Sequence, residues 1–120
     1  MKSATNTSSH HLGTIFTADD VKLHDCQGFL DFIHPLFEAH NVQNLGVLSH
    51  IFENGSFSLV VMLAESHISV HTWPENKCVQ LDVFLCNYEK DNSATGKVLY
   101  DTIIAFFNPN DSYLSTIERL

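Results

Sequence analysis

Two stretches of the chain carry apolar residues at the three- and four-residue steps typical of an amphipathic helix. The first should begin near Asp19, and its apolar stripe consists of Phe29, Leu30, Ile33, Leu36 and Phe37. The second should be capped by Ser93 and end at Asn108-Pro109, because a residue before proline is biased away from helical geometry. Its stripe consists of Val98, Leu99, Thr102, Ile103 and Phe106. The pattern therefore predicts two helices, each with one face to bury.

Other segments alternate with the period of two that is typical of strands. In residues 78–86 one face carries Val79, Leu81, Val83 and Leu85, and the other carries Cys78, Gln80, Asp82, Phe84 and Cys86. Further strands are expected at residues 11–17, 42–52 and 57–63, and residues 111–120 form an edge strand or a frayed tail. With both helices on one face, this order predicts an α+β fold, a two-layer sandwich of an antiparallel sheet and two helices.

The composition allows one folded unit. Of the 120 residues, 44% are apolar and 17% are charged, and this apolar fraction is enough to form a core. A chain of this length is too short for two separate cores. Residues 1–10 are polar and are expected to form a disordered leader. Residues 11–120 would then be the single domain.

The charge balance and the apolar runs exclude several classes of partner. Fourteen acidic residues against six basic ones give a formal charge of −8, which repels a phosphate backbone and favours small cationic ligands. The longest apolar run, residues 59–64, is far short of the ~20 residues of a membrane-spanning helix. The polar N-terminus has no secretory h-region, and the three cysteines suggest no disulfide framework. We therefore expect a cytoplasmic protein that binds neither nucleic acid nor membrane.

Residues 64–75, directly after an apolar strand, bring together an unusual density of reactive side chains. Two carboxylates, two serines, two histidines and the only tryptophan lie within this segment. On a helix, His67 and His71 could share a metal ion, but the Ile-Ser-Val between them favours extended structure, where they would lie ~13 Å apart. The segment therefore indicates a catalytic site without a metal.

The signature of the prokaryotic S-adenosylmethionine decarboxylase family resembles residues 65–75, which read Glu-Ser-His-Ile-Ser-Val-His-Thr-Trp-Pro-Glu. The resemblance extends more loosely over residues 11–86 and includes Phe52, Ser58 and an Asp-Val-Phe-x-Cys element at residues 82–86. It implies a self-processing, pyruvoyl-dependent enzyme that decarboxylates S-adenosylmethionine for spermidine synthesis. It also implies a dimer with the active sites at its interface.

In this family the proenzyme cuts its own chain, and the resemblance places the cut between Glu65 and Ser66. The Ser66 hydroxyl would attack the Glu65 carbonyl to form an ester. A histidine, matched here by His71, would then remove the proton that lets the ester eliminate. Ser58 matches a residue that positions this step. The product is a pyruvoyl group derived from Ser66, so no external cofactor is implied.

The resemblance also assigns roles in turnover. The pyruvoyl carbonyl would form a Schiff base with the substrate amine and accept electrons as carbon dioxide leaves. Cys86 matches the proton donor to the resulting carbanion, because a thiol is protonated at neutral pH and able to donate. Phe52 would stack on the adenine ring, and Glu75 would bind the ribose hydroxyls.

Several positions around the expected substrate pocket depart from the family pattern. The usual glycine-rich stretch reads Asn-Gly-Ser-Phe-Ser-Leu at residues 54–59, and Asn76-Lys77 replaces a Tyr-Gly pair. Two alternatives therefore stay open: a pyruvoyl-dependent decarboxylase of ornithine or arginine, and an inactive regulatory member. The second would require the loss of Ser66, His71 or Cys86, and all three residues are present.

Overall fold

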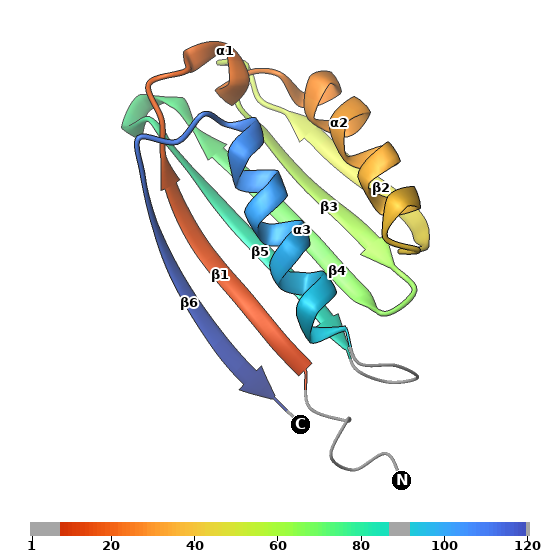
Figure 1. Ribbon diagram of the computed structural model, residues 1–120. Coiled ribbons are helices and arrows are strands. Elements are labelled where there is room, and N and C mark those ends of the chain that lie inside the picture. The colour runs from red at the N-terminus through yellow and green to blue at the C-terminus, as the bar shows by residue number, and fades with distance from the viewer. Residues whose placement is uncertain (1–7, 87–91, 120) are drawn as a thin grey trace, which may run out of the picture.

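An antiparallel sheet with helices packed against it makes up the structure (Figure 1). The structure is a computed structural model and describes residues 8–86 and 92–119. Within these residues six strands lie in the order β2-β3-β4-β5-β1-β6, so that β2 and β6 form the edges. The strands are β1 (Ser8–Phe16), β2 (Asn44–Ile51), β3 (Phe57–Leu63), β4 (Ser66–Trp73), β5 (Cys78–Cys86) and β6 (Asp111–Arg119).

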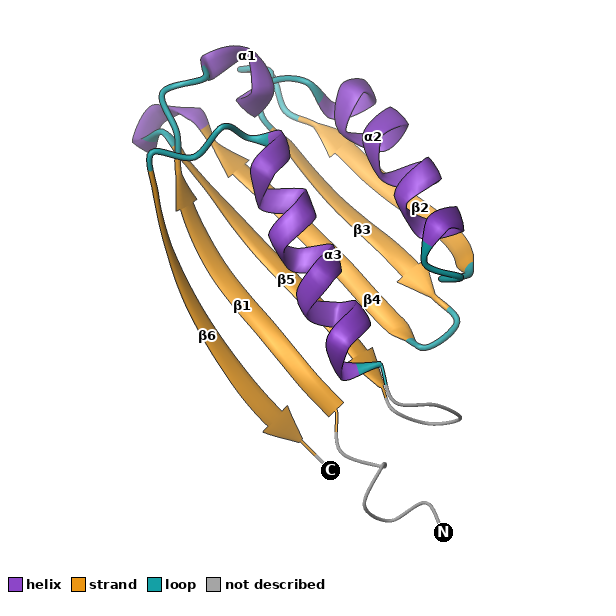
Figure 2. Cartoon of the chain, viewed as in Figure 1, coloured by secondary structure: helices purple, strands orange, loops and turns teal. Residues whose placement is uncertain are grey.

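The helices lie on one face of the sheet, which confirms the predicted two-layer α+β sandwich (Figure 2). They are α1 (Asp20–Leu23), α2 (Cys26–Ala39) and α3 (Ser93–Phe106), and a short 3-10 helix, η2 (Pro74–Asn76), links β4 to β5. The first predicted helix is two helices, because Asp25 begins a new one by accepting the Gly28 N–H at 2.9 Å. None of the helices in the described part of the chain is long and apolar enough to cross a membrane.

Element boundaries differ from the sequence prediction at Ser93 and at the start of β1, and one of the two alternatives for the C-terminal segment is confirmed. Ser93, predicted to cap the last helix, is its first residue, and Asn92 is the N-cap. β1 begins at Ser8, so residues 8–10 of the expected leader pair with both β5 and β6, while residues 1–7 lie outside the described part. The C-terminal segment is a full edge strand, since residues 111–119 pair with β1 along their whole length.

β4 is the main addition to the predicted strands. Its residues, which the sequence analysis treated as a reactive segment rather than a strand, pair with β3 and with β5. Ile68 and Val70 are fully buried beneath the helices, whereas His67 and His71 are only partly buried and alternate with them. The candidate catalytic side chains therefore stand on a central strand, on the face opposite the helices. We call this face the open face.

The core lies between the sheet and the two long helices. Phe29 of α2 is fully buried and stacks on Phe107, with ring centroids 5.7 Å apart, and it meets Phe106 edge-on at 5.4 Å. These contacts join α2 to the end of α3 and add to the area burial that stabilises the fold. The central strands therefore have a packed support beneath them.

Candidate active site

The peptide bond between Glu65 and Ser66 lies at the turn between β3 and β4. The backbone of Ser66 has a φ of 141°, a conformation that residues with a side chain rarely adopt. Holding a residue there costs on the order of 1–3 kcal/mol, which the surrounding structure must supply. The bond predicted to be cut is therefore next to a strained residue.

The carbonyl group of Glu65 is held by the neighbouring strand. Cys86, the last residue of β5, donates its backbone N–H to the Glu65 carbonyl oxygen at 2.8 Å. A donor in this place draws electron density from the carbonyl carbon and stabilises negative charge on the oxygen when that carbon is attacked. Glu65, Ser66 and Cys86, three of the predicted residues, thus lie together at one end of the sheet. We call this group the cleavage cluster.

His67 also lies in the cleavage cluster. Its Nδ1 atom is 3.4 Å from the Ser66 hydroxyl oxygen, at the long end of hydrogen-bond distances. The sequence analysis considered His67 only as a metal ligand and gave it no catalytic role. Its position directly after Ser66, at the bond predicted to be cut, was the signal that could have singled it out.

A cavity of about 450 Å³ opens near the opposite end of β4. The remaining four predicted residues line it: Phe52, Ser58, His71 and Glu75. Ser58 and His71 are cross-strand partners in β3 and β4, and Ser58 Oγ lies 2.8 Å from His71 Nδ1. The volume falls in the range of pockets that bind small organic molecules. We call this site the pocket cluster.

Trp73 lines the same cavity and was given no role by the sequence analysis. Its ring is 42% exposed and that of Phe52 is 46% exposed, so two aromatic side chains are available to a ligand. The indole Nε1 donates a hydrogen bond to Gln80 Oε1 at 3.0 Å, which fixes the orientation of the ring. Because Trp73 follows His71 by two residues on a strand, period-two alternation could have placed both on one face.

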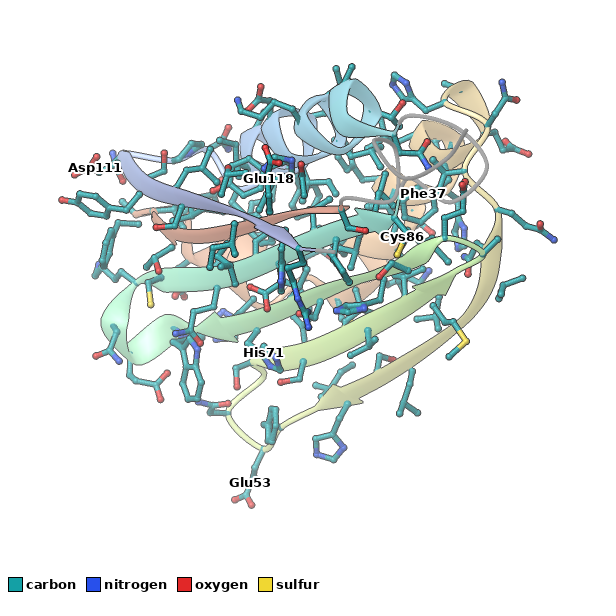
Figure 3. The ribbon with its side chains drawn as sticks, turned by 90° about the horizontal axis from the view of Figure 1, so that it is seen from below. Phe37, Glu53, His71, Cys86, Asp111 and Glu118 are labelled. Atoms are coloured by element: carbon teal, nitrogen blue, oxygen red, sulfur yellow. The ribbon has the colours of Figure 1, made fainter. Side chains whose placement is uncertain are left out.

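The two clusters lie apart within one chain. Five residues separate Ser66 from His71, which corresponds to roughly 16 Å along an extended strand. Figure 3 shows Cys86 and His71 at separate places on the sheet, with Glu53 of the cavity lining beyond His71. Ser66 and His71, which the sequence analysis expected to act on one bond, therefore do not meet in a single chain.

The other cysteines lie outside both clusters. Burial raises the pKa of Cys26 and of Cys78, and the Glu75 carboxylate adds to this effect at Cys78. Both thiols therefore stay protonated at neutral pH. Within residues 8–86 and 92–119, no group of three or more histidine, cysteine or acidic side chains could hold a metal ion.

Comparison with known proteins assigns the chain to a family of similar sequence and fold. A family model described as S-adenosylmethionine decarboxylase matches residues 9–120. In the solved structures, the adenosylmethionine decarboxylase from Aquifex aeolicus VF5 superposes with a TM-score of 0.80 at 26% identity, over 96% of this chain and 92% of that chain.

Similar curated proteins carry two different names. The S-adenosylmethionine decarboxylase proenzyme of Pyrobaculum islandicum is 31% identical over 87% of this chain and 88% of its own length. The corresponding proenzyme of Thermococcus gammatolerans is 40% identical over 77% of this chain and 64% of its own length. The arginine decarboxylase proenzyme of Ignicoccus hospitalis is 31% identical over 92% of this chain and 75% of its own length.

Proposed function

This chain belongs to the S-adenosylmethionine decarboxylase family, and we propose that it is a self-processing enzyme that decarboxylates S-adenosylmethionine. The product would serve as aminopropyl donor in spermidine synthesis. The observation that carries this proposal is the cleavage cluster: a strained serine whose preceding carbonyl is held by an N–H donor. We also propose a cytoplasmic location, because the three cysteines are all free, as in a reducing compartment.

The residues at the turn fit a pyruvoyl group formed from Ser66. The Ser66 hydroxyl attacks the carbonyl carbon of Glu65, and the Cys86 N–H stabilises the charge that develops on the carbonyl oxygen. The peptide bond becomes an ester. Removal of the Ser66 α-proton then releases the Glu65 carboxylate, and hydrolysis with loss of ammonia leaves the new terminus. His71 is the base that we assign to proton removal.

In turnover the pyruvoyl group supplies an electrophilic carbonyl that draws electrons from the substrate as carbon dioxide leaves. We assign the later proton donation to Cys86, whose backbone N–H binds the Glu65 carbonyl oxygen beside Ser66. Phe52 offers its ring to the adenine and Glu75 its carboxylate to the ribose hydroxyls. Trp73 adds a second aromatic surface to the same cavity.

The separation of the two clusters is the reason to propose a dimer. A single chain holds Ser66 at one end of β4 and His71 near the other, so a complete site needs His71 from a second copy. The open face carries exposed apolar side chains, among them Val60 at 40% and Met62 at 60% exposure. Two such faces packed about a twofold axis would cover these residues and bring opposite strand ends together.

Arginine is the competing substrate, because the relative from Ignicoccus hospitalis carries that name. The carboxylates of Glu53 and Glu75 line the pocket cluster and could bind the sulfonium group of S-adenosylmethionine or the guanidinium group of arginine. Its two aromatic side chains, Phe52 and Trp73, suit a planar purine, which arginine lacks. These rings favour S-adenosylmethionine.

A substrate panel tests the proposal. Release of carbon dioxide from S-adenosylmethionine, arginine, ornithine and lysine should be compared on purified protein, with Ser66→Ala as the inactive control. We expect intact-mass analysis to give two fragments, residues 1–65 and 66–120, and turnover of S-adenosylmethionine alone. Faster release from arginine would reassign the substrate, and an uncut chain would refute self-processing.

A further inference from the structure

His67 is the histidine closest to the reacting hydroxyl in a single chain. Its Nδ1 lies 3.4 Å from Ser66 Oγ. His71 lies roughly 16 Å from Ser66 along β4. Catalytic hydrogen bonds are often long before the reaction and shorten as it proceeds. The geometry thus supplies a base for Ser66 without any contribution from a second chain.

Side chains of neighbouring strands hold the His67 ring in place on the open face. Its centroid lies 5.7 Å from that of Phe84 on β5 and 6.3 Å from that of His10 on β1, both in edge-on contact. His10 in turn lies over Phe84 at 4.9 Å, and its Nε2 is 3.8 Å from Asp82 Oδ2. The His67 ring is therefore oriented by packing and does not depend on a single contact.

His10, which meets the His67 ring edge-on, has a lowered pKa. Burial lowers the pKa of His10 below the ordinary histidine value of 6.5, the Asp82 carboxylate opposes this, and His67 and Arg119 lower it further. At neutral pH His10 is therefore uncharged.

We propose that His67 is the general base of the first processing step, in which Ser66 attacks the carbonyl carbon of Glu65. This inference rests on the proposed self-processing. It divides the work between two histidines: His67 acts within its own chain on the hydroxyl proton, and His71 of a second copy acts later on the α-proton.

The step is balanced and needs no co-reactant. The lone pair of Ser66 Oγ forms a bond to the carbonyl carbon while the hydroxyl proton passes to His67 Nδ1. The carbonyl electrons move to the oxygen that accepts the Cys86 N–H. When the double bond re-forms, the bond from carbon to the Ser66 nitrogen breaks, and that nitrogen takes the proton back from His67. The peptide bond has then become an ester, and His67 is neutral again.

Hydroxylamine distinguishes the two histidines because it cleaves an ester and leaves an amide intact. The experiment follows the cutting of freshly refolded proenzyme by mass analysis, with and without hydroxylamine, in His67→Ala, His67→Gln and His71→Ala. We expect both His67 variants to be cut ~10²–10⁴-fold more slowly than wild type and to resist hydroxylamine. His71→Ala should instead collect an ester that hydroxylamine cleaves. Added imidazole should restore cutting to His67→Ala.

Two controls keep the outcomes separate. His34→Ala, an exposed position on α2, should be cut at the wild-type rate, and far-UV circular dichroism should show that each variant is folded. Cutting of a His67 variant at the wild-type rate, ester accumulation in it, or failure of imidazole to restore a folded His67→Ala would overturn the inference. A wild-type chain that is never cut would refute the proposed function itself.

Discussion

Cys86 contributes two different groups to the cleavage cluster, and we assign them to two different steps. Its backbone N–H binds the Glu65 carbonyl oxygen, while its side chain is a free, partly buried thiol. A substitution of the side chain leaves the N–H in place. Processing and turnover can therefore be separated at this one residue.

Cys86→Ala should still be cut, because alanine keeps the hydrogen bond to Glu65. Turnover should fall by about 10²–10⁴-fold, the usual effect of removing a general acid. Mass analysis of cutting and carbon dioxide release should be measured on the same sample. Wild-type turnover in a cut Cys86→Ala protein would make Cys86 a packing residue and not a proton donor.

His11 should make the fold sensitive to mild acid. It is 5% exposed on the helix side of β1, and its Nδ1 lies 3.0 Å from Thr116 Oγ1. Burial lowers its pKa, Lys97 lowers it further, and Asp101 opposes the change. The unfolded chain therefore binds a proton at a higher pH than the folded one, so stability falls as pH drops through about 6.5.

Urea unfolding at pH 7.5, 6.5 and 5.5 measures this effect. The drop in the free energy of unfolding toward pH 5.5 should be smaller in His11→Leu than in wild type. It should be unchanged in His34→Ala, whose side chain is exposed. An equal drop in His11→Leu and wild type would exclude His11 as the source, and His10, whose pKa is also lowered by burial, would be the next candidate.

At the scale of elements, the packing of α3 on β1 depends on one glycine. A Cβ built on Gly13 would overlap the Tyr100 side chain of α3, including its hydroxyl and ring. Tyr100 is 1% exposed, so its ring is enclosed by the core. The close approach of helix and strand therefore requires a residue without a side chain at position 13.

Gly13→Ala should lower the free energy of unfolding by about 1–3 kcal/mol, as overpacking of a filled core does. Gly46→Ala on β2 is the matched control, because nothing lies within 4 Å of its Cβ position. It should leave stability nearly unchanged. Equal urea midpoints for the two variants would show that α3 can shift without cost.

The sequence predicted the stripe of the first long helix and the faces of β5 because apolar periodicity reports directly on burial. In the second helix Val98, predicted in the stripe, is 43% exposed, whereas Tyr100, left out of it, is buried. The sequence favoured extended structure around Ile68 and Val70 but did not count β4 among the strands. In that segment the polar side chains stand on the open face and give it the composition of a reactive loop. The extended spacing of this segment was expected, but its consequence for Ser66 and His71 was not drawn, because motif spacing does not report which side chains meet in the fold.

At the scale of the whole molecule, the two clusters predict complementation between chains. Ser66→Ala lacks the hydroxyl but keeps His71, and His71→Ala keeps the hydroxyl but lacks the base. Each variant alone should remain uncut. Random mixing from the unfolded state should produce mixed dimers with one complete site, about a quarter of the sites in wild type.

Mass analysis of the refolded mixture measures the fraction of cut chain, and light scattering gives its oligomeric state. Only the His71→Ala chain should be cut, at the bond before its own Ser66. A dimeric mixture that remains uncut would mean that His71 does not act across an interface. Cutting in a fully monomeric sample would place the complete site within one chain.

Trp73, whose ring is held by the hydrogen bond to Gln80, makes the intrinsic fluorescence of the protein a reporter of the cavity. Trp73 is the only tryptophan in the chain and it lines the cavity, so all indole emission arises at that wall. A purine stacked beside it would quench this emission, and a flexible aliphatic amine would leave it nearly unchanged. Ligand binding in the pocket can thus be followed by tryptophan fluorescence in an uncut variant such as Ser66→Ala, in which neither chain cutting nor decarboxylation takes place.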